Sequence, residues 1–256
     1  MEIRRFYTED LNDGSTRVEL RGEEFLHLKK VLRLTTGAKV ILLNGRGIEA
    51  MGTIVAMTKQ DAVIRVEKKM QGTRESPLRI TLIQGLLKGE NTGLVAEKSV
   101  ELDVSEVRFF ISSRTVARAD SSAIKKKIER LKKVSISAVK QCERTLLPKI
   151  GICEYKDALD GFRDSLRIVF SERDGVNHIK TILEKCGEKN GQIKDIALIV
   201  GPEGGLTDEE MDIAAAKGFV SASMGPIRLR AETAAIAALA IIGYALGGMG
   251  RWGQTS

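Results

Sequence analysis

The region from Ile196 to Ala238 alternates apolar runs with glycine-proline loops and helix-forming segments. The apolar run Ile196–Val200 ends at Gly201-Pro202-Glu203-Gly204-Gly205, and a later apolar run ends at Gly225-Pro226 before an alanine-rich helix. Both loops therefore follow predicted strands. Ligands of open α/β sheets bind outside the carboxyl ends of the strands, so the two loops together predict a ligand site.

The same alternation begins near Leu78 and predicts an α/β fold with a mostly parallel sheet. The predicted strands are Leu78–Gln84, Val107–Ile111, Leu166–Phe170, Ile196–Val200 and Val220–Met224, and the predicted helices are Glu90–Leu102, Ser121–Thr145, Val176–Cys186, Asp208–Lys217 and Glu232–Leu246. The longest uncharged stretch, Thr233–Gly250, is rich in alanine and glycine and predicts a buried helix rather than a membrane span.

The N-terminal region has a different pattern, in which short strands surround one helix. The predicted strands are Arg4–Tyr7, Arg17–Leu20, Lys39–Leu43, Glu49–Met57 and Ala62–Val66, and the predicted helix is Glu23–Leu34, with Phe25, Leu28, Val31 and Leu32 on one face. Several short strands separated by turns indicate a small barrel. The polar stretch Lys68–Ser76 before Pro77 is the expected linker, which divides the chain into domains at residues 1–72 and 73–256.

Composition excludes several classes of protein. Hydrophobic residues make up 43% of the chain and charged residues 29%, which is typical of a globular protein. No apolar stretch follows the basic start, so we expect no signal peptide. The cysteines Cys142, Cys153 and Cys186 are odd in number and lack metal-ligand spacing. They predict a cytoplasmic protein without a structural metal.

The net charge of +7 is concentrated in one segment. Between Arg108 and Lys149, twelve Lys and Arg residues accompany three Asp and Glu residues, whereas the rest of the chain is close to neutral. A basic segment on an otherwise balanced protein indicates a polyanionic partner.

The predicted helix Ser121–Thr145 carries much of this charge on one face. Its apolar stripe consists of Ile124, Ile128, Leu131, Ser135, Ala138 and Cys142, and its basic row of Lys126, Arg130, Lys133, Ser137, Lys140 and Arg144. An offset of two residues rotates a side chain by about 200°, so the basic row lies opposite the core. A merely solvated face is the alternative, but such a face usually mixes signs of charge, so the row favours binding to a phosphate backbone.

The first glycine loop lacks the signatures of phosphate-binding loops. No Gly-Lys-Ser/Thr follows Gly201, and the G-x-G-x-x-G spacing is absent. Thr207 and Glu210 form a predicted capping box, and Gly218 suits the left-handed end of that helix. The acidic residues 208–210 at the helix start repel phosphate. The loop therefore favours a ligand that is neutral or cationic where it touches.

The second loop brings arginines and a carboxylate to a helix entrance. Glu232 lies in the first helical turn, where a stabilising interaction with the helix dipole is an alternative to a functional role. Arg230 has no comparable structural reason to be there, which favours contact with substrate. The two histidines, His27 and His178, lie in different predicted domains, so the sequence gives no support for nucleophilic catalysis. His27 is expected at the surface or facing RNA.

Several segments share the pattern of one known family. They are Leu198–Thr207, Met224-Gly225-Pro226 and Leu229–Ala234 in the paired loops, and elsewhere Arg4-Arg5-Phe6, His27–Arg33, Glu75-Ser76-Pro77, Glu97–Leu102, Gln141 with Arg144, and Ser171-Glu172-Arg173. With these segments the whole chain resembles the ribosomal RNA small subunit methyltransferase E family. The paired loops are highly specific, and the N-terminal matches are individually weaker.

This resemblance implies transfer of a methyl group from S-adenosylmethionine to N3 of one uridine in 16S rRNA of the small ribosomal subunit. It also implies a PUA-like β-barrel for RNA, a SPOUT-type domain whose C-terminal segment threads a trefoil knot, and a homodimer. The cofactor-binding residues carried over are Val200, Gly201, Gly204, Gly205, Met224, Gly225, Ile227, Leu229 and Thr233. The expected RNA-binding residues are Arg4, Arg5, His27, Arg33, Lys126, Arg130, Lys133, Lys140 and Arg144.

The chain departs from the family pattern at four positions. Its second loop reads Gly225-Pro-Ile-Arg-Leu-Arg230, so the first arginine is shifted to Arg228 and its role is open. Ala231 stands where threonine is frequent, Lys140 where glutamate is frequent, and Asp103 where glycine is usual. The loop glycines and Arg230 are retained, so we expect an active enzyme.

Methylation at uracil N3 requires removal of a proton. We expect Arg230 to stabilise the uracil anion or clamp a neighbouring phosphate, and Glu203 or Glu232 to act as the base. Because N3 lies on the Watson–Crick edge, the uridine must be unpaired or flipped. Three alternatives stay open: an enzyme of the same fold acting on another RNA position such as a ribose 2′-hydroxyl, a non-catalytic RNA-binding relative, and a small-molecule α/β enzyme.

Overall fold

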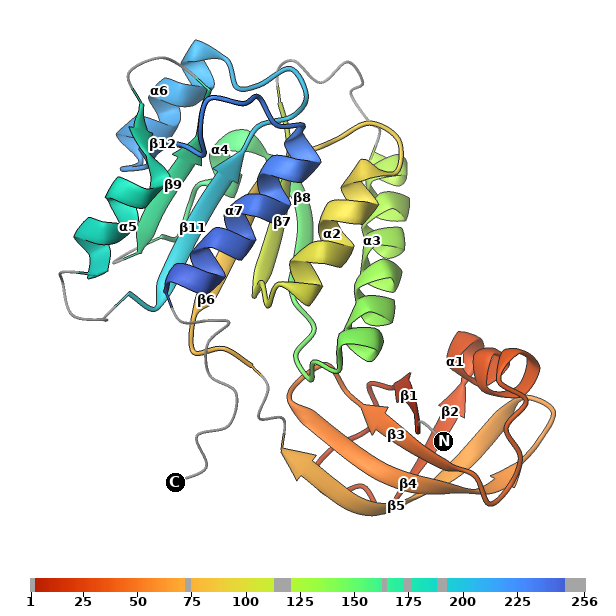
Figure 1. Ribbon diagram of the computed structural model, residues 1–256. Coiled ribbons are helices and arrows are strands. Elements are labelled where there is room, and N and C mark those ends of the chain that lie inside the picture. Colours follow the sequence, from red (N-terminus) through yellow and green to blue (C-terminus); the bar gives the residue numbers. More distant parts are fainter. Residues whose placement is uncertain are drawn as a thin grey trace. The chain divides into compact units, whose positions relative to one another are not determined.

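The computed structural model describes residues 3–71, 75–112, 121–162, 165–172, 176–187 and 193–246. The chain forms two compact units, one of Met1–Glu75 with Ile136–Leu147 and the other of Ser76–Ser135 with Pro148–Ser256 (Figure 1). The predicted boundary between residues 72 and 73 lies outside the described residues. The segment Ile136–Leu147 groups with the N-terminal unit, although it lies far downstream in the sequence.

The N-terminal unit is built on a five-stranded sheet. Its strands are β1 (Arg4–Tyr7), β2 (Arg17–Arg21), β3 (Lys39–Leu43), β4 (Ile48–Met57) and β5 (Asp61–Gln71), in the order β1-β3-β4-β5-β2. β1 runs parallel to β3, and the other neighbours are antiparallel. Alternate residues such as Val18 and Leu20 point into one core, which Phe25 and Leu28 cover. The predicted small β-rich domain is confirmed, but the last strand includes the first residues of the expected linker.

The predicted helix Glu23–Leu34 has a different course. α1 (Gly22–Leu26) continues into a π-helical turn, η1 (His27–Val31), in which the N–H of Leu32 donates to the carbonyl of His27 at 3.0 Å. The wider turn keeps Leu28 buried but leaves Val31 66% exposed. The prediction that Val31 faces the core was therefore wrong, because the extra residue in the turn changes the helical period. Arg33 ends the segment in the left-handed region, at φ 52°.

The second unit is a seven-stranded sheet in which every pair of neighbours is parallel. Its strands are β6 (Arg79–Gly85), β7 (Glu106–Ile111), β8 (Lys149–Glu154), β9 (Leu166–Phe170), β10 (Asn177–His178), β11 (Asp195–Val200) and β12 (Val220–Ser223), in the order β10-β12-β9-β11-β6-β7-β8. The helices that follow them are α2 (Asn91–Glu101), α3 (Ser121–Cys142), α4 (Tyr155–Ala158), α5 (Ile179–Gly187), α6 (Asp208–Ala216) and α7 (Ala231–Ala245). Only residues 121–135 of α3 belong to this unit. The predicted α/β fold is confirmed.

Helices cover both faces of this sheet. On the central strand β11, Ile196 and Leu198 pack into the core shared with α2, α5 and α7, and Ala197 and Ile199 into the core shared with α4 and α6. This alternation follows from the two-residue period of a strand. Because both faces are covered, the sequence of β11 contains an unbroken apolar run. On one of these faces α7 lies beside α2 (Figure 1).

Three elements of this unit were not predicted: β8, α4 and β10. β8 is an edge strand whose middle residues are only half-buried and include Gly151, so it lacks the continuous apolar run of the central strands. α4 is short, and β10 occupies Asn177–His178. The prediction that the helix begins at Val176 was therefore wrong, because α5 begins only at Ile179. Asp103, which stands where the family usually has glycine, adopts φ 61°. Aspartate tolerates that left-handed conformation better than most residues, and the Asp103 carboxylate accepts the Ser76 N–H at 2.7 Å.

Candidate functional site

A cavity of about 790 Å³ lies where the carboxyl ends of β9, β11 and β12 meet the start of α7. These strands are neighbours in the parallel sheet, as the sequence predicted for the two glycine-proline loops. The predicted residues that line the cavity are Val200, Gly201, Glu203, Gly204, Gly205, Met224, Gly225, Ile227, Leu229, Arg230 and Glu232. Thr233 is not among the lining residues, and its side chain is exposed on α7.

The geometry of the first loop explains its glycines. The Gly205 N–H donates to the Pro202 carbonyl at 2.8 Å and closes a tight turn. Gly205 has φ 69°, which favours glycine, and a Cβ on Gly201 would lie 3.2 Å from the Leu206 nitrogen. A side chain at either position would therefore strain the turn or push it open.

The helix after this loop begins with the predicted capping box. Thr207 Oγ1 accepts the Glu210 N–H at 3.1 Å, and Glu210 Oε2 accepts the Thr207 N–H at 2.9 Å. The buried Glu210 carboxylate also accepts the Ser112 hydroxyl at 2.8 Å. Burial, together with the charge of Glu210, raises the pKa of Tyr155, whose hydroxyl donates to the Glu210 carbonyl at 2.9 Å. The helix that supports the loop is therefore anchored to the end of β7 and to α4.

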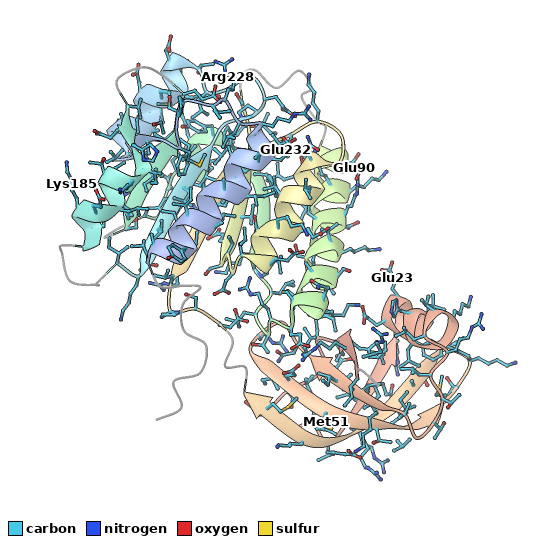
Figure 2. The ribbon with its side chains drawn as sticks, in the orientation of Figure 1. Glu23, Met51, Glu90, Lys185, Arg228 and Glu232 are labelled. Atoms are coloured by element: carbon cyan, nitrogen blue, oxygen red, sulfur yellow. The ribbon has the colours of Figure 1, made fainter. Side chains whose placement is uncertain are left out.

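The second loop, between β12 and α7, carries the exposed Ile227. Arg228, which follows it, is also exposed (Figure 2). Gly225 has φ 131°, which a residue with a Cβ rarely adopts. Arg228 Nε lies 2.5 Å from Glu172 Oε2, and both residues line the cavity. The shifted arginine therefore joins the second loop to the segment after β9. Sequence reasoning missed this role of Glu172, although Ser171-Glu172 had been noted as similar to the family.

Arg230 and Glu232 lie at the entrance of α7 and face the same cavity. Arg230 is the N-cap residue of α7, but its side chain makes no capping bond. Among the described residues, its guanidinium has no hydrogen-bond or ion-pair partner. Glu232 occupies the first turn of the helix, as predicted. The cavity is thus bordered by a carboxylate and by a cation that has no partner in the part of the chain that the structure describes.

The predicted RNA-binding residues of the N-terminal unit divide into two groups. Arg4, His27 and Arg33 are exposed. Arg5 is only 11% exposed and forms ion pairs with Glu49 and, at 3.4 Å, with Glu143. Its charge is already compensated within the unit.

The basic row of α3 is exposed over only part of its length. Lys126, Arg130 and Lys133 are exposed, and Arg130 pairs with Glu90. Lys140 lies 2.5 Å from Glu24 and is largely buried.

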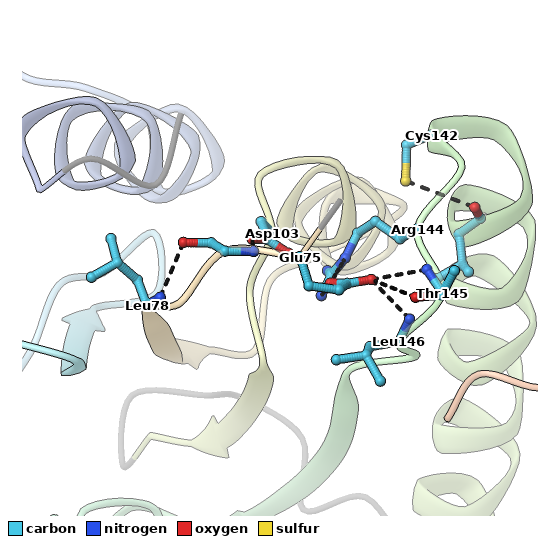
Figure 3. A network of polar contacts seen from close by, with 9 residues as sticks. Glu75, Leu78, Asp103, Cys142, Arg144, Thr145 and Leu146 are labelled. Carbon is cyan, nitrogen blue, oxygen red and sulfur yellow. Dashed lines mark hydrogen bonds and ion pairs between the residues drawn. The ribbon is translucent and has the colours of Figure 1, made fainter. Parts of the chain in front are cut away.

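Arg144 does not continue the basic row. α3 ends at Cys142 and Glu143 adopts φ 63°, so the helical period no longer applies to Arg144. Arg144 is 6% exposed and donates to Glu75 Oε2 at 2.9 and 3.0 Å (Figure 3). The prediction that it lies on the exposed face was wrong for this reason.

Glu75 accepts further hydrogen bonds from the backbone after α3. Its Oε1 accepts the N–H groups of Thr145 and Leu146 at 2.8 and 2.9 Å (Figure 3). Burial by itself raises the pKa of Glu75, but the charge of Arg144 and these hydrogen bonds outweigh burial and hold it below its usual value.

Two kinds of site are absent from the described part of the chain. Within the described ranges, no three His, Cys, Asp or Glu side chains are grouped so that they could hold a metal ion. In the same part of the chain, no helix combines the length and the apolarity that a membrane span requires.

Known proteins share this arrangement over almost the whole chain. Residues 74–243 match the family model of an RNA methyltransferase domain, and residues 20–67 match that of an RNA methyltransferase PUA domain. The chain is 27% identical over 231 residues to ribosomal RNA small subunit methyltransferase E of Bacillus subtilis, which covers 88% of this chain and 89% of that protein.

Two solved structures are similar along almost their whole length. One is a methyltransferase from Legionella pneumophila in complex with the cofactor S-adenosylmethionine, with a TM-score of 0.86, 30% identity and coverage of 96% of this chain and 98% of that one. The other is ribosomal RNA small subunit methyltransferase E from Neisseria gonorrhoeae bound to S-adenosylmethionine, with a TM-score of 0.82, 29% identity and coverage of 95% and 98%.

The matched domains and the fold define an RNA methyltransferase with an N-terminal PUA domain. Within this class, the chain belongs to the ribosomal RNA small subunit methyltransferase E family. The resemblance noted in the sequence is thereby confirmed.

Proposed function

We propose that this protein transfers a methyl group from S-adenosylmethionine to N3 of a uridine in the 16S rRNA of the small ribosomal subunit. The observation that carries the proposal is the cavity formed by both glycine-proline loops at the carboxyl ends of β11 and β12. Membership of the family and the S-adenosylmethionine bound by two similar structures support it.

The residues around the cavity fit S-adenosylmethionine. A volume of about 790 Å³ accommodates a ligand of this size, and all five residues of the tight turn Gly201–Gly205 line the cavity. Val200, Met224 and Leu229 offer apolar surface for a purine ring. The acidic start of α6 suits a cationic ligand better than a phosphate.

Two side chains at the entrance of α7 are available to act on the base. When bound, S-adenosylmethionine supplies an electrophilic methyl group. Arg230 stabilises the negative charge that develops on uracil, or clamps the neighbouring phosphate, and a carboxylate accepts the N3 proton. Glu232 is the candidate base that lines the cavity without a partner among the described residues.

RNA binding is assigned to exposed basic side chains of each unit. They are Arg4, His27 and Arg33 in the N-terminal unit, and Lys126, Arg130 and Lys133 on α3. We further propose domains near residues 1–72 and 73–256, a trefoil knot in the C-terminal segment, and a homodimer that acts in the cytoplasm, where its rRNA substrate is made.

Calorimetric titration with S-adenosylmethionine, followed by methyl transfer to RNA, tests the proposal. We expect binding and transfer to small-subunit rRNA, with RNA affinity that falls steeply as salt increases. A protein that binds RNA but not the cofactor would instead be a non-catalytic relative. Binding of the cofactor without salt-dependent RNA affinity would favour a small-molecule enzyme.

A further inference from the structure

The loop Gly201–Gly205 is attached to the end of β6 and to the residues just after it. Three residues there take part: Gln84 and Gly85, the last two residues of β6, and Lys88. None of them lines the cavity. These residues therefore hold the loop on the side that faces away from the cavity.

Gln84 attaches the first residue of the loop. Its side chain is fully buried, and Nε2 donates to the carbonyls of Gly201 and Gly85, each at 3.1 Å. Exchanging the amide oxygen and nitrogen would set an acceptor against two carbonyl oxygens, which fixes the orientation. Oε1 has no hydrogen-bond partner among the described residues. A buried acceptor without a partner lowers stability. The contribution of the Gln84 side chain therefore comes from the two hydrogen bonds that its Nε2 donates.

Gly85 allows the loop to approach the end of β6. A Cβ on Gly85 would lie 2.5 Å from the Pro202 nitrogen and 2.5 Å from its Cδ. A Cβ atom essentially never makes non-bonded contacts shorter than 3.0 Å, so the neighbouring atoms would have to shift. The backbone of Pro202 therefore packs against the Cα of Gly85. A side chain at position 85 would push the loop away from β6.

Glu203 attaches the far side of the loop. Its Oε1 accepts the backbone N–H of Lys88 at 2.8 Å. The charge of the carboxylate strengthens this bond, which lies at the exposed surface of the loop. It turns the Glu203 carboxylate toward the segment after β6, although the residue also borders the cavity.

From these contacts we infer that Glu203 is a positioning residue rather than the base that accepts the N3 proton, and that Gln84 positions the same loop from its other end. Together they fix the backbone of Gly201–Gly205 in the shape that holds the cofactor. This inference rests on the proposed function, which identifies the cofactor as S-adenosylmethionine. It leaves Glu232 as the carboxylate that acts on the base.

Substitutions at Glu203 separate positioning from proton transfer. Glu203→Ala removes the acceptor, and we expect the Kd for S-adenosylmethionine to rise roughly tenfold. Glu203→Gln keeps an acceptor oxygen and should recover most of the affinity, with a kcat pH profile of the same shape as the wild type. The matched controls are Glu184→Ala and Glu184→Gln, which change the same charge at an exposed position on α5 outside the cavity lining.

A base at Glu203 would give a different result. Glu203→Gln would then lose turnover as severely as Glu203→Ala while both bound the cofactor like the wild type, and the inference would be overturned. Gln84→Met tests the other attachment, because it keeps a side chain of similar length and removes both donors. It should weaken cofactor affinity about as much as Glu203→Ala, with little change in Tm; unchanged affinity would contradict the role of Gln84.

Hydrogen exchange tests the attachment without any cofactor. The Lys88 amide should exchange slowly in the wild type and in Glu203→Gln, and faster in Glu203→Ala. Equal rates in the wild type and Glu203→Ala would overturn the inference even if the cofactor binds. Conversely, a wild type with a slow Lys88 amide and no affinity for S-adenosylmethionine would contradict the proposed function and leave the attachment of the loop standing.

Discussion

The two arginines of the second loop have different surroundings. Arg228 pairs with Glu172 at 2.5 Å, whereas the Arg230 guanidinium has no partner among the described residues. The pair at Arg228 satisfies its charge and joins two segments around the cavity. The charge of Arg230 is left for a ligand, which fits its expected role at the uridine.

Arg230→Ala should lower turnover and leave the cofactor in place. We expect kcat for methyl transfer to fall about 100-fold or more, because removing one group that stabilises a developing anion has effects of this size. The Kd for S-adenosylmethionine should stay within about twofold of the wild type. Arg228→Ala is the comparison variant and should lose less turnover; a turnover of Arg230→Ala equal to the wild type would exclude Arg230 from the reaction.

The sequence predicted the loops of the site better than it predicted the contacts that hold these loops in place. The loops at Gly201 and Gly225 could be located because glycine, proline and a preceding apolar run are local signals. The contacts of Gln84 and Glu172 could not, because their partners Gly201 and Arg228 are distant in sequence and meet only after folding. A glutamine at the end of an apolar strand gives no local sign of its partner.

At the scale of elements, the central strands were predicted closely and the exceptions have physical causes. β9 begins and ends where expected, and β11 begins one residue earlier, because burial on both faces produces continuous apolar runs. The end of α3 was missed because Glu143, rather than a glycine, adopts the left-handed conformation that stops the helix. The π-helical turn of η1 was missed because the apolar spacing of residues 25–32 also fits an ordinary helix.

The Glu75–Arg144 pair should make the stability of the N-terminal unit depend on pH. Glu75→Gln leaves Arg144 buried without its counter-charge, and we expect a loss of about 3 kcal/mol at pH 7. The pKa of Glu75 is lowered in the folded state. Its contribution is thus fully present above the unfolded pKa, about 4.3, and is lost as the pH falls through the lower folded pKa.

Urea unfolding across this pH range checks the prediction. The difference between the wild type and Glu75→Gln should be largest near neutral pH and should shrink in acid. Asp13→Asn is the control, since Asp13 is exposed in the same unit. A difference that stays constant with pH would show that the charge of Glu75 does not stabilise the unit.

Gly85→Ala should disturb the junction between β6 and the first loop. We expect overpacking at this position to lower the free energy of unfolding by about 1–3 kcal/mol. The affinity for the cofactor should also fall, because Pro202 must move to make room for the new Cβ. Gly93→Ala is the matched control: it lies within α2 with open space around a new Cβ, and should raise stability by roughly 0.5–1 kcal/mol. Thermal unfolding and cofactor titration of both variants check the pair, and equal behaviour would contradict the close packing at Gly85.

In the molecule as a whole, the excess of basic residues and the proposed cofactor site lie in different parts of the sequence. The exposed lysines of α3 belong to the basic segment between Arg108 and Lys149, whereas the cavity residues lie mostly after Phe170. We therefore expect that the protein can lose RNA affinity without losing affinity for the proposed cofactor.

The double variant Lys126→Gln with Lys133→Gln should bind RNA more weakly than the wild type. Each lost phosphate contact reduces the salt slope of RNA affinity by about one, so the slope should fall by about two. The control removes two exposed lysines of α5, Lys180 and Lys185. Filter binding at several salt concentrations compares the two, and equal slopes would remove α3 from the RNA-binding surface.

The most direct test of the central claim is the identity of the modified nucleoside. Small subunits from cells that lack the endogenous enzyme would be incubated with the protein and S-adenosylmethionine, and the 16S rRNA analysed by mass spectrometry. The account predicts one N3-methyluridine per 16S rRNA, absent with Arg230→Ala. A methyl group on a ribose 2′-hydroxyl, or on a base other than uracil, would contradict it.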